Sequence, residues 1–308
     1  MEQLYHVPVM GQEVVNYLVG DKKGIYFDGT LGGGGHAQII LDILDKDGLY
    51  IAIDRDMDAI HTAKERLKSY KNFKAHCAIF DKIEDILNRE GVKSLDGILL
   101  DLGVSSWQID QDKRGFSFRP GLNLDMRMDV SQDLTAEWVI NNYSKDELKR
   151  IFKEYGEERF SGRIAHFIVA QRSKQKLASS SDLIKIIDKC VNPRFATKSY
   201  ARIFQAIRIE VNDELNILKN TLKEALKFLK KKGRLAVITY HSLEDRIVKN
   251  FFRDQENPCI CPPELPVCAC GRQATMKRIK PLFIQASPDE IKSNPRARSA
   301  KLRVAEKV

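Results

Sequence analysis

The sequence contains no run of about 20 consecutive apolar residues, so no segment is long enough to cross a bilayer as a helix. Its first ten residues, MEQLYHVPVM, lack the basic stretch followed by an apolar one that is typical of a secretory signal. Six cysteines among 308 residues are too few for a disulfide scaffold. The phosphate-binding motif G-x-x-x-x-G-K-[ST] is absent, and GVSSW at 103–107 is not the G-x-S-x-G turn of α/β hydrolases. We therefore expect a cytoplasmic protein with no membrane segment.

Positive charge, in contrast, is abundant. The chain has 51 Lys and Arg against 42 Asp and Glu, a formal net charge of +9. Residues 257–308 hold ten basic and four acidic residues, so about two thirds of this excess lies in the last sixth of the chain. This distribution favours nucleic acid as a partner, with Arg296, Arg298 and Arg303 as candidate contacts. A surface that only promotes solubility is the alternative.

The order of apolar segments divides the chain into three parts. Residues 1–106 alternate short buried strands with helices, which predicts a parallel, doubly wound α/β sheet. Residues 107–213 show five helical segments and no strong strand, which predicts an inserted all-helical domain. The α/β pattern returns over 214–308, with a helix from Glu214 to Lys232 that ends at Gly233. PLFIQ and AKLRVAEKV are expected to pair as an antiparallel edge.

The stretch GIYFDGTLGGGGHAQII (24–40) raises the question of function. Asp28 ends an apolar strand, four glycines follow at 32–35, and Asp54 ends the next strand. This order differs from the G-x-G-x-x-G pattern of dinucleotide-binding proteins. It is typical of Rossmann-like class I methyltransferases that use S-adenosylmethionine, in which Asp28 and the glycine amides would hold the methionine end. Asp54 would bind the ribose and Phe80 would cover the adenine, unless Asp54 merely caps the following helix.

The fourth strand, LDGILLD, ends at Asp101, where this fold presents the methyl acceptor. The exocyclic amine of cytosine or adenine is a poor nucleophile because its lone pair is delocalised into the ring. An oxygen that accepts its N–H hydrogen bond favours a nucleophilic nitrogen and stabilises the positive charge that develops during attack. Asp101 is therefore the candidate catalytic residue. The alternative is that Asp101 only caps the turn.

Seven segments spread over nearly the whole chain resemble the ribosomal RNA small-subunit methyltransferase H family. They are HVPVM (6–10), FDGTLGGGGH (27–36), DLGVSSWQID (101–110), RGFSFR (114–119), QAIRIEVNDEL (205–215), YHSLEDRIVKNFF (240–252) and NPRARSAKLRVAE (294–306). The resemblance implies a class I methyltransferase with an inserted helical domain. It also implies N4-methylation of one cytidine in the decoding region of 16S rRNA.

The resemblance also implies specific cofactor contacts. They fall on Gly34, Gly35, His36, Asp54, Phe80, Asp101 and Gln108. From the residues alone, His36 is equally well interpreted as a surface histidine in the first turn of a helix. The run of four glycines is a small departure, because relatives often carry a larger residue within it.

A target base inside structured RNA must be turned out of its stack, which requires contacts around the pocket. Arg114 and Phe116 follow the fourth strand and are candidates to clamp or stack on the base, whereas ordinary packing is the alternative for Phe116. The oligomeric state stays open, with a homodimer as one option. The competing functions are methylation of DNA or a small molecule, a non-catalytic RNA-binding role and, remotely, an NAD-linked oxidoreductase.

Four cysteines form a C-x-C-x6-C-x-C pattern at Cys259, Cys261, Cys268 and Cys270. Four thiolates can bind zinc tetrahedrally, but the usual spacing is C-x2-C and C-x-C is tight for one ion. Reduced or reversibly oxidised thiols are the alternative. The sequence therefore assigns no metal ligand here and leaves the question open.

Overall fold

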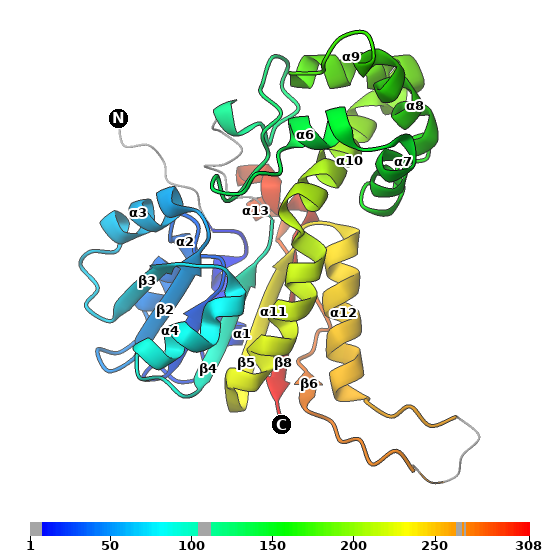
Figure 1. The fold of residues 1–308 in the computed structure, drawn as a ribbon. Helices are drawn as coiled ribbons and strands as arrows, with labels where there is room; N and C mark the ends of the chain where they lie inside the picture. Colours follow the sequence, from blue (N-terminus) through cyan, green and yellow to red (C-terminus); the bar gives the residue numbers. More distant parts are fainter. Residues whose placement is uncertain (1–7, 104–111, 263–266, 268) are drawn as a thin grey trace. The chain divides into compact units, whose positions relative to one another are not determined.

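The computed structural model describes residues 8–103, 112–262, 267 and 269–308 (Figure 1). The chain divides into two compact units, which are the described residues of Met1–Gly103 with Leu215–Val308, and those of Val104–Glu214. No described helix is both long and apolar enough to cross a membrane.

The first unit is built on a single sheet of eight strands. Five of them are parallel and lie in the order β3-β2-β1-β4-β5, and β8 then runs antiparallel between β5 and β6, with β7 also paired to β8. The strands are β1 (Ile25–Asp28), β2 (Leu49–Asp54), β3 (Phe73–Cys77), β4 (Leu95–Asp101), β5 (Leu229–Thr239), β6 (Met276–Arg278), β7 (Ile284–Gln285) and β8 (Lys301–Lys307). This is the predicted Rossmann-like, class I methyltransferase arrangement.

Side chains alternate between the two faces of this sheet, as strand geometry requires. Tyr26 and Tyr50 pack into one core, whereas their neighbours Phe27 and Ile51 pack into the other. Residues of helices α1, α2 and α3 contribute to the first core, and residues of α4, α11 and α12 to the second. These helices are α1 (Gly11–Leu18), α2 (Gly35–Leu41), α3 (Met57–Arg66), α4 (Ile83–Arg89), α11 (Glu214–Phe228) and α12 (Ser242–Glu256). Two further short helices, α13 (Pro288–Ser293) and η3 (Pro295–Ser299), precede β8.

The second unit is helical over its described part and has a core of its own. Its helices are α6 (Ala136–Asn142), α7 (Lys145–Glu154), α8 (Ser161–Arg172), α9 (Ser180–Cys190) and α10 (Pro193–Asn212), preceded by the 3-10 turn η2 (Asp112–Arg114). The expected five helical segments are all present. The starts of α7 and α9 are fixed by reciprocal capping boxes at Ser144 and Ser179, which satisfy amides that the first turn leaves unpaired.

Two sequence-based expectations about the returning α/β part are wrong in detail. Helix α11 ends at Phe228 rather than Lys232, because Leu229 already pairs with Leu95 and Lys230 binds Asp96 at 2.7 Å. Gly233 does not end the helix: it lies within β5, where a Cβ would come 2.9 Å from the carbonyl oxygen of Leu95. Residues Ile284 and Gln285 do pair with β8, but β8 is an interior strand rather than an edge.

The position of Arg303 corrects its assignment as an RNA contact. Its side chain on β8 is buried, with 6% of the residue exposed, and its guanidinium donates to both carboxylate oxygens of Asp245 at 2.7 and 3.2 Å. It also donates to the carbonyl oxygen of Leu282 at 2.8 Å. Burial alone would raise the pKa of Asp245, but the hydrogen bonds from Arg303 hold this pKa below its usual value. Arg303 therefore fastens α12 to β8.

Other basic residues of the C-terminal part are also engaged within the fold. Arg278 pairs with Glu256, and the Lys307 ammonium donates to the carbonyl oxygens of Leu226 and Leu229. Arg298 remains exposed. The sequence count of positive charge thus overstates what this segment can offer to a polyanion.

We predict that Arg303→Ala lowers the free energy of unfolding by about 3–5 kcal/mol, because it leaves the Asp245 carboxylate buried without its main partner. Arg298→Ala, at an exposed position of the same segment, is the matched control and should change stability by less than about 0.5 kcal/mol. Urea unfolding followed by circular dichroism measures both. A loss of under 1 kcal/mol for Arg303→Ala would contradict this role.

Candidate active site

Three aspartates end strands of the sheet at the same edge. Asp28 is the last residue of β1, Asp54 of β2 and Asp101 of β4. Because these strands are parallel, their carboxyl ends meet where α/β folds bind ligands. The structure therefore brings together the three carboxylates that the sequence singled out.

Asp28 lies beneath this edge, with only 1% of the residue exposed. One carboxylate oxygen accepts from the backbone N–H and the hydroxyl of Thr30, at 2.9 and 3.2 Å, and the other accepts from the Tyr50 hydroxyl at 2.9 Å. Burial raises its pKa to about 6 in spite of these hydrogen bonds. Asp28 thus shapes the turn from below, and a direct contact with the methionine end of a cofactor stays a prediction.

The Thr30 hydroxyl links the first and fourth strands. It donates to Asp28, and its oxygen accepts the backbone N–H of Asp101 at 2.6 Å. The Asp101 side chain is then positioned by Tyr240, which follows β5 and donates its hydroxyl hydrogen to Oδ1 at 2.8 Å. Burial and the Asp101 charge raise the pKa of Tyr240, so this tyrosine stays a donor. Asp101 is thereby held at both its backbone and its side chain.

His36, in the first turn of α2, is buried and not a surface histidine: 7% of the residue is exposed. Its Nε2 lies 2.9 Å from the carbonyl oxygen of Val9, which can only accept, so Nε2 carries the hydrogen. Burial lowers the pKa of His36, which favours the neutral ring and leaves Nδ1 as an acceptor. That Nδ1 lies 3.5 Å from Oδ2 of Asp101.

Two acceptors therefore face each other across 3.5 Å. A nitrogen that carries two hydrogens could donate one to His36 and one to Asp101 from a position within about 3 Å of both. An exocyclic amine or an ammonium group has this property. The pair is suited to orient such a nitrogen at the end of β4.

The glycine turn has three distinct structural requirements. Gly32 and Gly34 adopt φ of 50° and 77°, the left-handed region that glycine enters without strain. A Cβ at Gly29 would lie 2.6 Å from the Leu100 side chain and 2.7 Å from Phe80, so packing excludes it. A Cβ at Gly33 would meet no described atom within 4 Å. Gly33 therefore keeps clear a space beside the turn, which fits a cofactor that lies against it.

Gly34 and Gly35 begin α2. Gly34 is its N-cap and supplies no side-chain hydrogen bond, so the first turn presents backbone amides, as a helix that binds a carboxylate would. The turn itself is held by Asp54, whose Oδ2 accepts the Gly32 N–H at 2.8 Å. These residues fit the carboxylate and ribose ends of S-adenosylmethionine.

Asp54 does not cap α3, so that alternative is wrong. The cap is Asp56, whose side chain accepts the N–H of Asp58, while Oδ1 of Asp54 accepts the N–H of Asp56 at 2.9 Å. Burial raises the pKa of Asp54, and the amides of Asp56 and Gly32 oppose that rise. Met57, directly after the cap, is strongly exposed.

Phe80 lies mainly in the core. It is 5% exposed and meets Phe27 edge to face, with ring centroids 5.7 Å apart. Its ring edge also closes over Gly29. Ile79 beside it is exposed, and Phe80 as the adenine wall stays a prediction.

Three further candidates lie after β4. Gln108 lies outside the described residues. Phe116 packs against the core of the helical unit, as its packing alternative stated, and the Arg114 guanidinium donates to the Met128 carbonyl oxygen at 3.0 Å. Neither of these two contacts singles out an RNA base.

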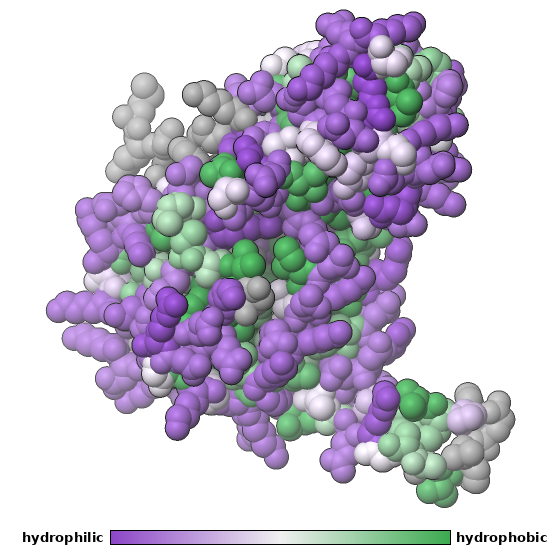
Figure 2. Space-filling view, in the orientation of Figure 1, coloured by the Kyte–Doolittle hydropathy of each residue, from purple (hydrophilic) through white to green (hydrophobic). Residues whose placement is uncertain are grey.

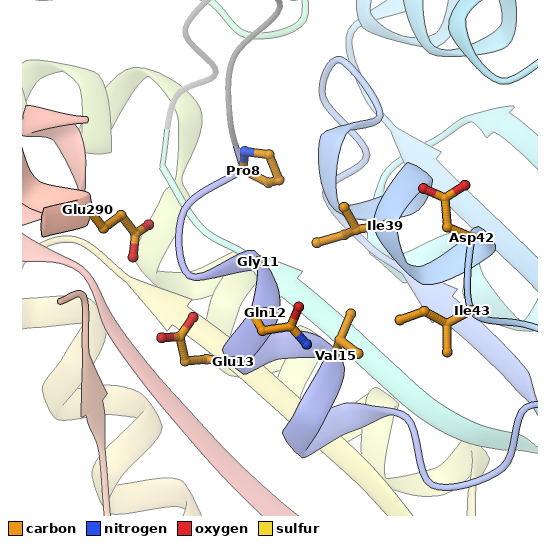
Figure 3. A pocket seen from close by; sticks show the side chains of 9 residues that line it. All are labelled: Pro8, Gly11, Gln12, Glu13, Val15, Ile39, Asp42, Ile43 and Glu290. Atoms are coloured by element: carbon orange, nitrogen blue, oxygen red, sulfur yellow. The ribbon is translucent and has the colours of Figure 1, made fainter. Parts of the chain in front are cut away.

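A surface pocket of about 460 Å³ lies elsewhere, between α1, α2 and α13 (Figure 3). Its lining includes three acids, Glu13, Asp42 and Glu290, over the apolar side chains of Ile39 and Ile43. It shares no residue with the three strand-end aspartates. A negatively charged rim is also unsuited to bind a polyanion.

Sequence reasoning missed Thr30, Tyr50 and Tyr240 as supporting residues. Tyr50 and Tyr240 are far in sequence from the carboxylates that they contact, Asp28 and Asp101. Thr30, in contrast, lies only two residues after Asp28. Thr30 belongs to the turn sequence D-G-T, in which a hydroxyl near an aspartate favours a local side-chain hydrogen bond. That signal was available, whereas the tyrosine contacts depend on strand order.

We predict that one glycine substitution at the turn lowers stability and that another weakens cofactor binding. Gly29→Ala should lower the free energy of unfolding by about 1–3 kcal/mol, because its methyl group overlaps Leu100 and Phe80. Gly33→Ala should leave stability within about 0.5 kcal/mol. It should nevertheless weaken S-adenosylmethionine binding about tenfold or more, because the methyl group enters the space beside the turn. Calorimetric titration measures the binding, and unchanged affinity in Gly33→Ala would refute the fit.

We also predict a pH-dependent stability contribution from Asp28. Its pKa rises from 3.8 when exposed to about 6 in the folded protein, so the folded state binds the proton more tightly. The contribution is complete below about pH 4 and is lost as pH rises through about 6, by about 3 kcal/mol. Asp28→Asn lacks it. Between about pH 4 and pH 7, the urea midpoint of the wild type should therefore fall relative to that of Asp28→Asn. Midpoints that change in parallel with pH would contradict the assignment.

Comparisons with known proteins identify relatives that span nearly the whole chain. The model of the MraW methylase family matches residues 3–308. The protein named Ribosomal RNA small subunit methyltransferase H of Caldicellulosiruptor bescii is 47% identical over 304 residues, covering 98% of this chain and 99% of its own. Its namesake in Halothermothrix orenii is 47% identical over 308 residues, covering 99% of each chain.

Among solved structures, an rRNA methylase from Streptococcus thermophilus has a TM-score of 0.41 at 11% identity, covering 97% of this chain and 93% of its own. The Aeropyrum pernix fibrillarin structure with bound S-adenosyl-L-methionine has a TM-score of 0.39 at 8% identity, covering 92% and 66%. The family and the relatives confirm the enzyme class that the sequence predicted, and S-adenosylmethionine as its cofactor. The chain belongs to the MraW methylase family.

Proposed function

We propose that the protein methylates N4 of one cytidine in the decoding region of 16S rRNA, within the small ribosomal subunit. The observation that carries this proposal is the pair of acceptors at the end of β4, Asp101 Oδ2 and His36 Nδ1, 3.5 Å apart. They match a nitrogen with two hydrogens, as in the exocyclic amine of cytosine. The names of the full-length relatives supply the substrate class, ribosomal RNA of the small subunit.

In this mechanism Asp101 and His36 orient the amine and Tyr240 keeps Asp101 in place. The bound cofactor would supply an electrophilic methyl group on sulfur. Transfer of that methyl group to the amine nitrogen would place positive charge on this nitrogen, next to Asp101. Asp101 stabilises that charge and is positioned to take the proton that the nitrogen releases. Holding the amine in line accounts for much of the remaining acceleration.

The cofactor would be held by residues of the same edge. Gly35 would present its amide to the cofactor carboxylate, beside Gly34, whose own N–H donates to the carbonyl oxygen of Leu31 at 2.9 Å, and Gly33 would leave room for the cofactor chain. Asp54 would accept from the ribose hydroxyls with the lone pairs that Gly32 and Asp56 do not use. Phe80 and Gln108 keep their proposed cofactor roles from the family resemblance alone.

The helical unit is proposed to recognise the RNA. Three of its exposed phenylalanines each have an exposed arginine as sequence neighbour: Phe118 with Arg119, Phe160 with Arg159, and Phe195 with Arg194. Aromatic rings stack on unpaired bases, and guanidinium groups bind phosphates. Such pairs are suited to single-stranded segments around a base that has been turned out. Arg303, buried against Asp245, is not included in this surface.

The decisive experiment offers the protein labelled S-adenosylmethionine with small subunits that lack the modification, naked 16S rRNA, or DNA. Nucleoside mass analysis should find N4-methylcytidine in the rRNA. Methylation at another atom of cytosine, or of DNA alone, would overturn the proposal.

Two variants then separate catalysis from cofactor binding. Asp101→Ala should lower kcat about 100-fold or more, because it removes an acceptor that acts on developing charge. Asp54→Ala should weaken cofactor binding by roughly 1.5–3 kcal/mol. Asp58→Ala removes an exposed carboxylate near the same edge and is the control for both. If Asp101→Ala abolished cofactor binding as well, its role would be mainly structural.

A further inference from the structure

The segment that joins α12 to β6, residues 257–275, is a long connection, and its described residues form no helix or strand. None of its described residues belongs to the three hydrophobic cores. Ile260 is 65% exposed and Val267 76% exposed, and the loop extends away from the sheet (Figure 1) with apolar side chains on its surface (Figure 2). Burial of apolar surface therefore does not hold this loop in shape.

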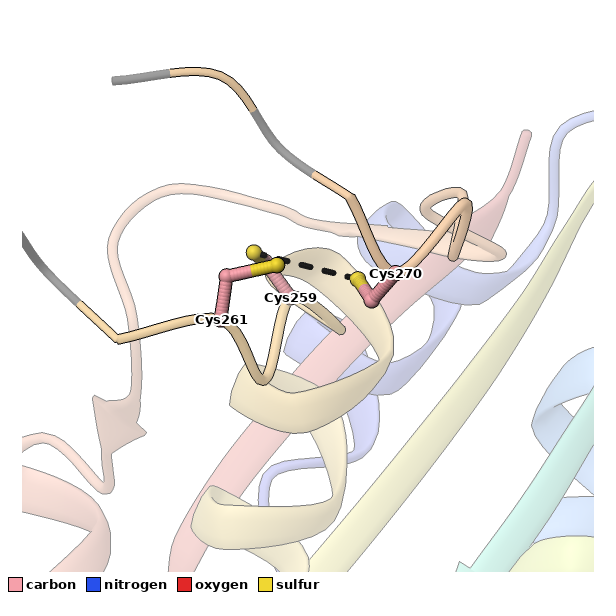
Figure 4. A group of neighbouring side chains, drawn as sticks. All are labelled: Cys259, Cys261 and Cys270. Carbon is pink, nitrogen blue, oxygen red and sulfur yellow. Dashed lines mark hydrogen bonds between the residues drawn. The ribbon is translucent and has the colours of Figure 1, made fainter. Parts of the chain in front are cut away.

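Three cysteines converge inside it. The sulfur atoms of Cys259, Cys261 and Cys270 all lie within 4.8 Å of one another, and those of Cys259 and Cys270 are 3.9 Å apart (Figure 4). In a tetrahedral zinc site with Zn–S bonds of about 2.3 Å, neighbouring sulfurs lie about 3.8 Å apart. The two sides of the loop thus bring their thiols to the spacing that one zinc ion requires.

The backbone around the cluster is also suited to thiolates. The N–H of Ala269 points at Cys261 Sγ, 3.3 Å away, and an N–H donor stabilises negative charge on sulfur. Gly271 follows Cys270 with φ of 64°, a left-handed turn that glycine makes at little cost. The tight C-x-C spacing is no obstacle, because the Cys259 and Cys261 sulfurs approach the same point.

We propose that Cys259, Cys261 and Cys270 bind a structural Zn²⁺ ion. Each thiol loses its proton to solvent on binding, and no electron is transferred. Soft thiolates in a tetrahedral set favour zinc over the hard ions magnesium and calcium. The sequence supplies a fourth cysteine, Cys268, two residues before Cys270.

The site is separate from the proposed chemistry. Helix α12 begins beside Tyr240, at the Asp101 edge of the sheet, and the cysteine loop follows its other end. Fifteen helical residues separate the two, about 22 Å along the axis. The ion would therefore order the loop and leave cofactor binding unchanged.

The test uses the full chain without a metal-binding tag, purified under reducing conditions in the presence of zinc. Elemental analysis should find about one zinc per chain. Cys259→Ser and Cys270→Ser should each lose most of it. Cys77→Ser, at an exposed cysteine outside the loop, is the matched control and should retain it. Loss of zinc in Cys268→Ser would define a four-cysteine site, and retention would define a three-cysteine site with solvent; both support the proposal.

Two measurements on the wild type avoid any dependence on variant folding. Titration with Co²⁺ should give sulfur-to-metal charge transfer and the absorption of a tetrahedral ion, both abolished by excess Zn²⁺. Chelation should open residues 257–275 to protease cleavage while S-adenosylmethionine affinity stays the same. Protein with fully reduced thiols that binds no zinc, protein that holds iron instead, or equal zinc loss in Cys77→Ser would each overturn the proposal.

Discussion

The hydroxyl of Thr30 joins the two strands on which the proposed chemistry depends. Its hydrogen goes to Asp28 on β1 and its oxygen accepts the backbone N–H of Asp101 on β4. Since Asp28 is buried beneath the turn, its carboxylate fixes the hydroxyl, which in turn fixes the end of β4. Tyr50 and Tyr240 complete this arrangement from the neighbouring strands. The edge therefore behaves as one hydrogen-bonded unit, in which moving any member displaces the carboxylate that would meet the amine.

Two carboxylates with little exposure, Asp28 at the strand edge and Asp245 in α12, differ in the direction of their pKa shift. Asp28 has no cationic side chain as a hydrogen-bond partner, and desolvation raises its pKa to about 6. Asp245 is also partly buried, but Arg303 and Lys301 lie against it and its pKa is lowered. The first arrangement costs stability near neutral pH and shapes a ligand site, whereas the second stabilises the junction of α12 with β8. A charge at the ligand edge is thus tolerated for function, and a charge elsewhere is paired.

The sequence was sufficient for most of the fold and for the candidate carboxylates, because strand ends can be located from apolar runs. Asp28, Asp54 and Asp101 each follow such a run, and parallel strands place their ends together. The end of α11 was missed because Leu229 and Lys230 fit the local helical pattern. Strand pairing of Leu229 with Leu95 and the ion pair of Lys230 with Asp96 instead place both residues in β5. Arg303 was misassigned because charge counts along a sequence carry no information on burial. Tyr240 was missed because its partner, Asp101, is 139 residues away in the chain.

The cysteine loop, residues 257–275, cannot be stabilised in the way that the glycine turn is. The turn at Gly32 to Gly35 is held from two strands by Asp54 and Asp28, so its geometry follows from the sheet. The described part of residues 257–275 lies away from the sheet and has neither core contacts nor regular structure. A segment of this length loses much conformational entropy if it is ordered, and exposed apolar side chains return little of it. Coordination of one ion by several thiolates can supply that free energy locally. Such coordination requires three sulfur atoms that lie close together, as those of the three described cysteines of this loop do.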